Sequence, residues 1–372
     1  METGWPCRAK FHQNIRDFKW YRERIMKMLK YEKWVVTAEE FVTRIIDASR
    51  LKKCSIMVTG ATGLIGSAVL DILIYLNENK GYEMNLYAAV RMPENARKRF
   101  GPFYQKPYFH IVSYDANQPV DFDFSVDYII QAASNADPAA IQEYPVETLM
   151  SNVYGVRQML EYSRKKQIRR MLFVSSSEVY GTNTTGELFK ETDYGAVDIL
   201  NPRASYPMGK RAAETLCVSY AEEYDLDTVI VRPGHIYGPT ITERDSRASA
   251  QFTRKALAGE NIVMKSEGRQ LRSYCYVYDC ATAILTVLLN GHAGSAYNIS
   301  NKDSVISIRD IASLFAEKGN TQLIFEIPTD KERAGYNLMD MSALNAGALE
   351  QLGWRAVADA PRGVEMTLQL ME

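Results

Sequence analysis

The sequence predicts an α/β protein built on a Rossmann-like, doubly wound parallel sheet with a smaller C-terminal substrate lobe and a helical N-terminal extension. Three observations predict it. Short β-branched segments alternate with helical ones from residue 53 onward, a glycine-rich turn joins the first strand to a helix, and a serine cluster follows a later strand. Strands that alternate with helices form a parallel sheet covered on both faces.

Six segments have the apolar, β-branched composition of buried strands. They are Ser55–Thr59, Asn85–Val90, Phe109–Ser113, Tyr128–Ile130, Met171–Ser175 and Thr228–Arg232. Helical spacing of apolar residues lies between most of them, as in Val146–Ser163 and Ala204–Tyr224. After about residue 240 the alternation loosens. We therefore expect an N-terminal extension over 1–52, a dinucleotide-binding domain over 53–240 and a substrate-binding lobe over 241–372, with some elements shared between the last two.

The N-terminal extension carries two segments, Phe18–Leu29 and Ala38–Ile46, that mix apolar and charged residues at helical spacing. We expect two or three amphipathic helices that pack on the main body or on a second subunit. A helix lying on a membrane surface is the less favoured alternative, because acidic residues are interspersed. The extension contains no motif with recognisable chemistry.

Composition excludes several classes of partner. The 372 residues carry a formal net charge of -1, which argues against nucleic acid or an anionic membrane as a partner. The cysteines are odd in number and match no metal or redox spacing, so we expect no metal and reduced thiols. No apolar run reaches the roughly 20 residues of a membrane helix, and no secretory signal begins the chain. We expect a cytoplasmic protein.

A glycine-rich turn joins the first strand to the helix behind it. The run Thr59-Gly60-Ala61-Thr62-Gly63-Leu64-Ile65-Gly66 spaces its glycines one residue wider than the G-x-G-x-x-G fingerprint. Glycine permits a tight turn and close approach to a pyrophosphate, and the helix N-terminus offers free N–H groups. The residues expected to contact a dinucleotide here are Gly60, Thr62, Gly63, Leu64, Ile65 and Gly66.

The end of the second strand bears on which dinucleotide is bound. An acidic residue there binds the ribose diol of NAD, whereas an arginine accommodates the 2′-phosphate of NADP. The second strand ends in Arg91 and carries no acid, which favours NADP, although a solvated arginine is the other interpretation. Asp115, after the third strand, is a candidate to accept a hydrogen bond from the adenine amine.

A serine, a tyrosine and a lysine are the candidate catalytic residues. The run Ser175-Ser176-Ser177-Glu178 lies at the end of a strand, where parallel sheets bind their ligands. Tyr206 and Lys210 are four residues apart and share one helix face. An ammonium close to a phenol lowers the pKa of the phenol, which would make Tyr206 a usable base near neutral pH.

From about Lys53 to the C-terminus the chain resembles the NAD-dependent epimerase/dehydratase family of extended short-chain dehydrogenases. The resemblance rests on the glycine turn, on Tyr206 with Lys210, and on further motifs: Asn152-Val153-Tyr154-Gly155, Val179-Tyr180-Gly181, Arg232-Pro233, Ile236-Tyr237-Gly238-Pro239, and Arg272 before Tyr276-Val277-Tyr278-Asp279. It implies tightly bound NAD, a nucleotide-linked sugar or polyol as substrate, and a homodimer formed through a four-helix contact.

The resemblance also implies a role for each matching residue. Ser176 would hydrogen-bond the reacting hydroxyl, Tyr206 would take its proton, and Lys210 would hold the nicotinamide ribose and tune the phenol. Arg272 would grip the substrate diphosphate with its guanidinium fork. The residues implied to line the rest of the dinucleotide site are Gln131, Ala132, Ala133, Asn152 and Pro233.

Three positions depart from the family pattern. Gln131 stands where the family often has histidine, and His235 stands where it usually has a substrate-binding asparagine. The 4,6-dehydratases of the family carry Asp-Glu after the catalytic serine, whereas this chain has Ser177-Glu178, as in UDP-glucuronate decarboxylases and some epimerases. Ser177 and His235 are therefore candidate substrate contacts, and Glu178 is a candidate second base beside the redox centre.

These residues favour a sugar-nucleotide epimerase that works through a transient keto intermediate. The first alternative is a UDP-glucuronate-type decarboxylase, in which a ketone forms a β-keto acid that loses CO2; a 4,6-dehydratase is weakened by the missing aspartate. An NADPH-dependent reductase is mildly favoured by Arg91. A dinucleotide-binding protein without turnover is opposed by the complete set of Ser176, Tyr206 and Lys210.

Overall fold

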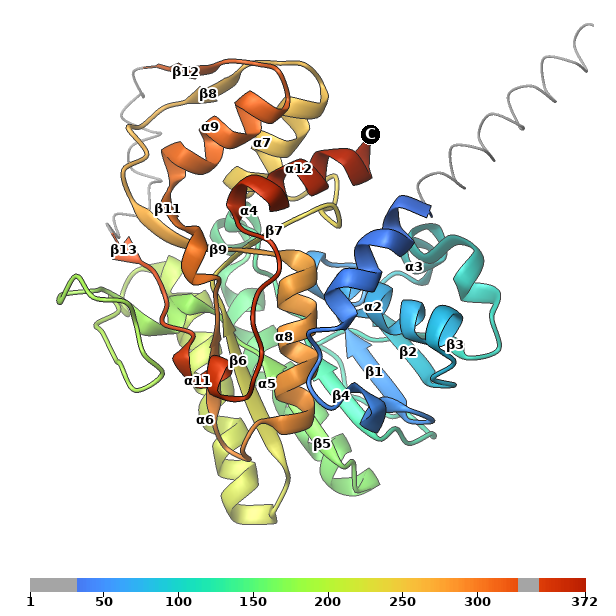
Figure 1. Ribbon diagram of the computed structural model, residues 1–372. Coiled ribbons are helices and arrows are strands. Elements are labelled where there is room, and N and C mark those ends of the chain that lie inside the picture. Colours follow the sequence, from blue (N-terminus) through green and yellow to red (C-terminus); the bar gives the residue numbers. More distant parts are fainter. Residues whose placement is uncertain (1–31, 327–340) are drawn as a thin grey trace, which may run out of the picture.

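The protein is built around a seven-stranded, entirely parallel sheet, seen in a computed structural model that describes residues 32–326 and 341–372 (Figure 1). The strand order is β10-β6-β5-β4-β1-β2-β3, so the order reverses between β1 and β4. The strands are β1 (Ser55–Thr59), β2 (Asn85–Val90), β3 (Phe109–Ser113), β4 (Tyr128–Gln131), β5 (Arg170–Val174), β6 (Thr228–Pro233) and β10 (Ala296–Ile299). The prediction of a Rossmann-like α/β fold is confirmed.

Side chains that alternate along each strand cover the two faces of this sheet. On β1, Ile56 and Val58 belong to one apolar core, whereas Met57 belongs to the other. The first core contains α2 (Leu64–Lys80), α3 (Pro93–Phe100) and α8 (Val277–Asn290); the second contains α5 (Pro145–Lys166) and α6 (Ser205–Tyr224). A short helix, α4 (Pro138–Glu143), precedes α5. Helices therefore bury both faces, and the strand ends remain as the open edges.

Smaller sheets form a lobe above the carboxyl ends of the main strands (Figure 1). In one, β9 (Leu271–Tyr276) pairs with β7 (His235–Tyr237), β11 (Val305–Ser307) and β13 (Met341–Ser342). In the other, β8 (Ile262–Met264) pairs with β12 (Leu323–Phe325). The lobe also contains α7 (Ala248–Leu257), α9 (Ile308–Lys318) and α12 (Ala360–Met371), with α11 (Gly347–Gln351) beside β10. Because α8 and β10 belong to the main body, the chain enters the body twice.

The described part of the N-terminal extension packs on the main body. Residues 32–42 are helical, and η1 (Ala48–Leu51) follows. Phe41 is fully buried, with its ring centroid 5.5 Å from that of Tyr276 and 5.9 Å from that of Tyr278. Glu39 forms an ion pair with Lys80 of α2 at 2.7 Å, and Glu40 forms one with Arg362 of α12 at 2.6 Å. This helix therefore contacts both the body and the lobe, whereas the predicted helix Phe18–Leu29 lies outside the described residues.

Candidate active site

A turn shaped for phosphate lies at the carboxyl end of β1, where the strand order reverses. Gly60 has φ +62°, and a Cβ there would lie 2.9 Å from the carbonyl oxygen of Ala132; a Cβ on Gly66 would lie 2.4 Å from that of Gly60. Only glycine permits this backbone approach. Gly63 caps α2 without a side-chain hydrogen bond, which leaves the first N–H groups of the helix, from Leu64 on, for a ligand. These features fit a dinucleotide pyrophosphate at a topological switch point.

The strand ends beside this turn carry the residues predicted to meet the adenosine half. Arg91 follows β2, is exposed, and makes no ion pair with any residue in 32–326 or 341–372. Asp115 follows β3 by two residues and accepts a hydrogen bond from the N–H of Asn117 at 3.0 Å. Arg91 is thus available to an incoming phosphate, while Asp115 already holds its own loop.

Gln131 lies deeper than the sequence suggests. Its side chain is fully buried: Oε1 accepts a hydrogen bond from Thr59 Oγ1 at 2.8 Å, and Nε2 donates to the hydroxyl of Tyr114 at 3.2 Å. Thr59 Oγ1 also accepts the N–H groups of Ala132 and Ala133, both at 3.0 Å. Gln131 therefore braces β4 against β1, and Ala132 and Ala133 flank the glycine turn through their backbone. Thr59 was missed by the sequence analysis, although it directly precedes Gly60.

The serine, tyrosine and lysine converge at the carboxyl end of β5. Ser176 caps η3 (Ser177–Tyr180) just beyond the strand, and Tyr206 and Lys210 lie on the first turns of α6. The ammonium of Lys210 lies 5.8 Å from the ring centroid of Tyr206 and donates to the carbonyl oxygen of Val174 at 2.8 Å. All three side chains therefore lie at the edge where a parallel sheet binds its ligand.

Burial dominates the proton affinities of this pair. Burial, followed by the charge of Glu178, raises the pKa of Tyr206 to about 12. Burial lowers the pKa of Lys210 to about 7. The ammonium of Lys210 is directed to a β5 carbonyl group, and its effect on the pKa of Tyr206 stays a prediction. The groups that do lower the pKa of the phenol are Ser176, through a hydrogen bond, and Arg247 and Arg203, through their charges.

Two arginines beside Tyr206 were not identified from the sequence. Arg203 lies in η4 (Pro202–Ala204) and binds both carboxylate oxygens of Glu178, at 2.8 and 3.1 Å. Arg247 precedes α7 and donates from Nε to Asp245 Oδ1 at 2.9 Å. Arg203 stands three residues before Tyr206, a spacing that could have drawn attention to it. Arg247 lies 41 positions after Tyr206 in the sequence, and no local sequence pattern indicates that the two residues are close.

Helix α5 packs against α6, the helix that carries Tyr206 and Lys210. Asn152 is fully buried, donates to the carbonyl oxygen of Thr148 at 2.8 Å and accepts a hydrogen bond from Ser134 Oγ at 3.0 Å. A Cβ on Gly209 of α6 would lie 3.1 Å from Cβ of Asn152. The two helices therefore pack closely one turn beyond Tyr206, and this contact helps to fix the position of α6.

The predicted substrate contacts lie on β7, β9 and η3. His235 of β7 is exposed, yet the surrounding protein, and then the charges of Arg272 and Arg247, lower the pKa of its imidazole to about 3. At that pKa the imidazole is uncharged near neutral pH. Arg272 is buried on β9, whose partner strand β7 follows the buried Pro233 at the end of β6. Ser177 is buried in η3.

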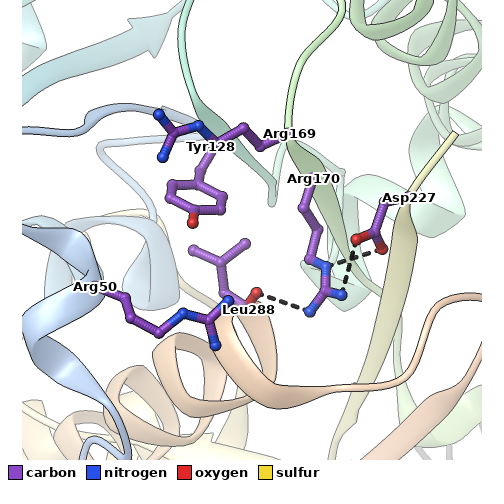
Figure 2. Close-up of a pocket in the computed structure, with 6 residues that line it drawn as sticks. All are labelled: Arg50, Tyr128, Arg169, Arg170, Asp227 and Leu288. Carbon is purple, nitrogen blue, oxygen red and sulfur yellow. Dashed lines mark hydrogen bonds and ion pairs between the residues drawn. The ribbon is translucent and has the colours of Figure 1, made fainter.

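A separate pocket of about 390 Å³ lies at the amino-terminal ends of β4 and β5 (Figure 2). Its arginines serve the fold: Arg170 pairs with Asp227 at 2.8 Å, and both Arg170 and Arg50 donate to carbonyl oxygens at the end of α8. Cations are favourable at a helix C-terminus. Ligands of parallel sheets bind at the other edge, so this pocket is not the candidate site.

Residues 32–326 and 341–372 show neither a membrane span nor a metal site. No helix in these ranges is long and apolar enough to cross a membrane. Among the same residues, no group of three or more histidines, cysteines, aspartates or glutamates is arranged to hold a metal ion. The four cysteines that the structure describes there are buried free thiols.

The glycine turn, the switch point and the Ser176, Tyr206, Lys210 set define a dinucleotide-dependent enzyme of the short-chain dehydrogenase type. Residues 56–300 match the model of the "NAD dependent epimerase/dehydratase family". The chain belongs to this family, which confirms the resemblance found in the sequence.

Two similar curated relatives are UDP-glucuronic acid decarboxylases. The chain is 28% identical over 316 residues to UDP-glucuronic acid decarboxylase 1 of Xenopus tropicalis, covering 84% of this chain and 71% of the relative. It is 32% identical over 246 residues to UDP-glucuronic acid decarboxylase 3 of Arabidopsis thaliana, covering 66% and 69%.

Proteins of solved structure with the same fold carry the names of different enzymes. UDP-glucose 4-epimerase of Thermotoga maritima, solved with UDP-glucose, matches with a TM-score of 0.71 and 21% identity over 85% of this chain and 98% of that one. dTDP-glucose 4,6-dehydratase of Bacillus anthracis, solved with NAD, matches with a TM-score of 0.71 and 20% identity over 85% and 96%. At this identity the likeness establishes the fold and leaves the reaction open.

Proposed function

We propose that this protein is a nicotinamide-dinucleotide-dependent decarboxylase of a nucleotide-linked uronic acid, with UDP-glucuronate as the first substrate to test. The proposal replaces the epimerase as the leading hypothesis. The observation that carries it is Glu178, which lies beside Tyr206. Glu178 follows Ser177, and Ser177 stands where the 4,6-dehydratases have an aspartate. The relatives named above, all UDP-glucuronic acid decarboxylases, support the same reaction.

The cleft residues have defined tasks in this reaction. A bound nicotinamide dinucleotide would accept a hydride from C4 of the sugar and later return it. Tyr206 takes the proton of the C4 hydroxyl, and Ser176 holds that oxygen by a hydrogen bond. The pKa of about 12 means that Tyr206 keeps its proton in the free protein, so the charges of Arg203 and Arg247 matter because they favour the phenolate.

The substrate wall suits an anionic nucleotide sugar. Arg272 would bind the diphosphate, while neutral His235 and Ser177 would bind sugar hydroxyls. Once C4 is a ketone, the C5–C6 bond breaks, its electron pair passes to C5, CO2 leaves, and a proton from water reaches C5. Glu178 is the charged side chain beside the redox centre for this second half of the reaction.

The dinucleotide would be held by the glycine turn and by Lys210, with Arg91 near the adenosine ribose. We propose NADP as a cofactor worth testing beside NAD, because Arg91 is exposed and makes no ion pair with the described residues. The family resemblance favours NAD. Separate titrations of the cofactor-free protein with each dinucleotide decide between them.

We further propose a homodimer formed through α5 and α6. These helices and the residue before them expose large apolar side chains, a pattern typical of an interaction surface. The side chains are Tyr144, Val146, Leu149, Met150, Val218 and Tyr224. We also propose three regions of the chain: an extension over 1–52, a dinucleotide domain over 53–240 and a lobe over 241–372. A cytoplasmic location is proposed as well.

Product mass spectrometry tests the proposal directly. The purified protein is incubated with NAD and with UDP-, CDP-, GDP- and dTDP-sugars, including UDP-glucuronate. Loss of CO2 from UDP-glucuronate is the expected result. An isomer of unchanged mass would establish the epimerase instead; in that reaction Glu178 could take a proton from C5. Loss of water would establish a dehydratase.

A further inference from the structure

A bidentate ion pair between Arg203 and Glu178 lies beside Tyr206. Arg203 Nη1 and Nη2 bind the two carboxylate oxygens of Glu178 at 2.8 and 3.1 Å. The side chains of Arg203 and Glu178 are 34% and 28% exposed, so solvent screens the pair only in part. The guanidinium fork matches the carboxylate and fixes its direction as well as its charge.

Both partners are also fixed through their backbone. The side chain of Asn201 accepts the N–H of Arg203 at 3.0 Å, which caps η4. The N–H of Glu178 donates to Ser176 Oγ at 3.2 Å, which caps η3. The ion pair therefore joins the segment that carries Ser176 to the turn that leads into Tyr206, and neither end can rotate freely.

The pair also balances charge at the reacting phenol. The charge of Glu178 raises the pKa of Tyr206, and the charges of Arg203 and Arg247 lower it. Arg247 is itself bound to Asp245. Without Arg203, the carboxylate of Glu178 would lose this fixed direction, and Arg247 alone would oppose its effect on the pKa of Tyr206.

We propose that Arg203 is a positioning residue that holds the carboxylate of Glu178 in a fixed direction, toward C5 of the sugar. There Glu178 orients the water molecule that gives C5 a proton after CO2 has left. The step balances: CO2 leaves with the C5–C6 electron pair retained at C5, water gives its proton to C5, and the hydroxide combines with CO2 as bicarbonate. The inference rests on the proposed decarboxylation. It assigns Arg203 to the second half of the reaction, after C4 has been oxidised.

Single-turnover absorbance separates the two halves. NAD-loaded wild type, R203Q and R203K are mixed with UDP-glucuronate, and reduced nicotinamide and CO2 are followed together. In R203Q we expect nicotinamide reduction to slow only several-fold, because Arg247 still favours the Tyr206 phenolate. CO2 release should fall about 100-fold, the cost of misplacing a reacting group, so that reduced nicotinamide accumulates. R203K retains charge without the fork and should lie between the two, and guanidinium ion should partly restore R203Q.

Arg211 supplies the matched control. It lies on α6 and binds the backbone beyond Glu178, donating to the carbonyl oxygens of Val179 and Gly195, both at 2.7 Å. A merely structural role for Arg203 predicts that R203Q and R211Q slow reduction and CO2 release by the same factor, and that result would overturn the inference. If wild type itself releases no CO2 from UDP-glucuronate, the proposed function fails first and the inference falls with it.

Discussion

The helix formed by residues 32–42 should be held mainly by one aromatic side chain rather than by its ion pairs. Phe41 is fully buried against Tyr276 and Tyr278, whereas the ion pairs of Glu39 and Glu40 lie on the surface. The test compares Phe41→Ala with the double change Glu39→Gln and Glu40→Gln. Val36→Ala, on the same helix at a position 74% exposed, is the matched control.

The magnitudes differ enough to decide the question. Truncation of a buried phenylalanine removes its transfer free energy and leaves a cavity, at a cost of about 3–5 kcal/mol. An exposed ion pair contributes about 0.2–1 kcal/mol, so the two pairs together contribute at most about 2 kcal/mol. We expect Phe41→Ala to lower the free energy of unfolding by more than the double change, and Val36→Ala to alter it by less than about 0.5 kcal/mol.

Denaturant unfolding with linear extrapolation measures these differences, and limited proteolysis within residues 32–42 reports whether the helix detaches. Phe41→Ala should open the helix to protease, and the glutamine variant should remain protected. The reasoning is refuted if the double change destabilises the protein as much as Phe41→Ala does. It is also refuted if Phe41→Ala stays within about 1 kcal/mol of wild type.

Four further changes test the proposals. Tyr206→Phe should lower turnover at least about 100-fold while cofactor titration still shows binding, and retained turnover would exclude this base. Arg91→Ala should weaken NADP more than NAD in calorimetry; equal losses would exclude a 2′-phosphate contact. Burial raises the pKa of Asp279 from 3.8 to about 7, so the folded protein binds the extra proton and stability should fall as pH rises through that range; Asp279→Asn should flatten the slope in thermal scans. Met150→Glu should yield monomers in sedimentation, and an unchanged dimer would place the contact elsewhere.

The main sheet was predictable because its strands carry their signal locally. Strands buried on both faces are nearly continuous apolar runs, and β1, β2 and β3 have the predicted bounds. The short strands of the lobe were not identified. Ile262–Met264 becomes a strand by pairing with Leu323–Phe325, about 60 residues away, and three residues carry no period of their own. Long-range pairing decided those elements.

The candidate site divides in the same way. The spacing of Tyr206 and Lys210 places both on one helix face, and the structure places them together beside Ser176. The depth of Gln131 was misjudged, because its partners come from other strands: Thr59 ends β1, and Tyr114 follows β3. Hydrogen bonds that cross a sheet leave no pattern along the chain.

The charges around Tyr206 suggest where this chain distinguishes itself within its family. The residues proposed to take the proton and to hold the cofactor follow the family motif, so the proposed oxidation step would be shared with epimerases, dehydratases and decarboxylases. The second half of each reaction depends on what stands beside the ketone, and here that is a carboxylate held by Arg203, with Arg247 held by Asp245 on the other side. Both arginines lower the pKa of the phenol, and each is bound to an acid. Because Arg247 remains when the Arg203–Glu178 pair is broken, we expect that change to slow the second half of the reaction more than the first oxidation.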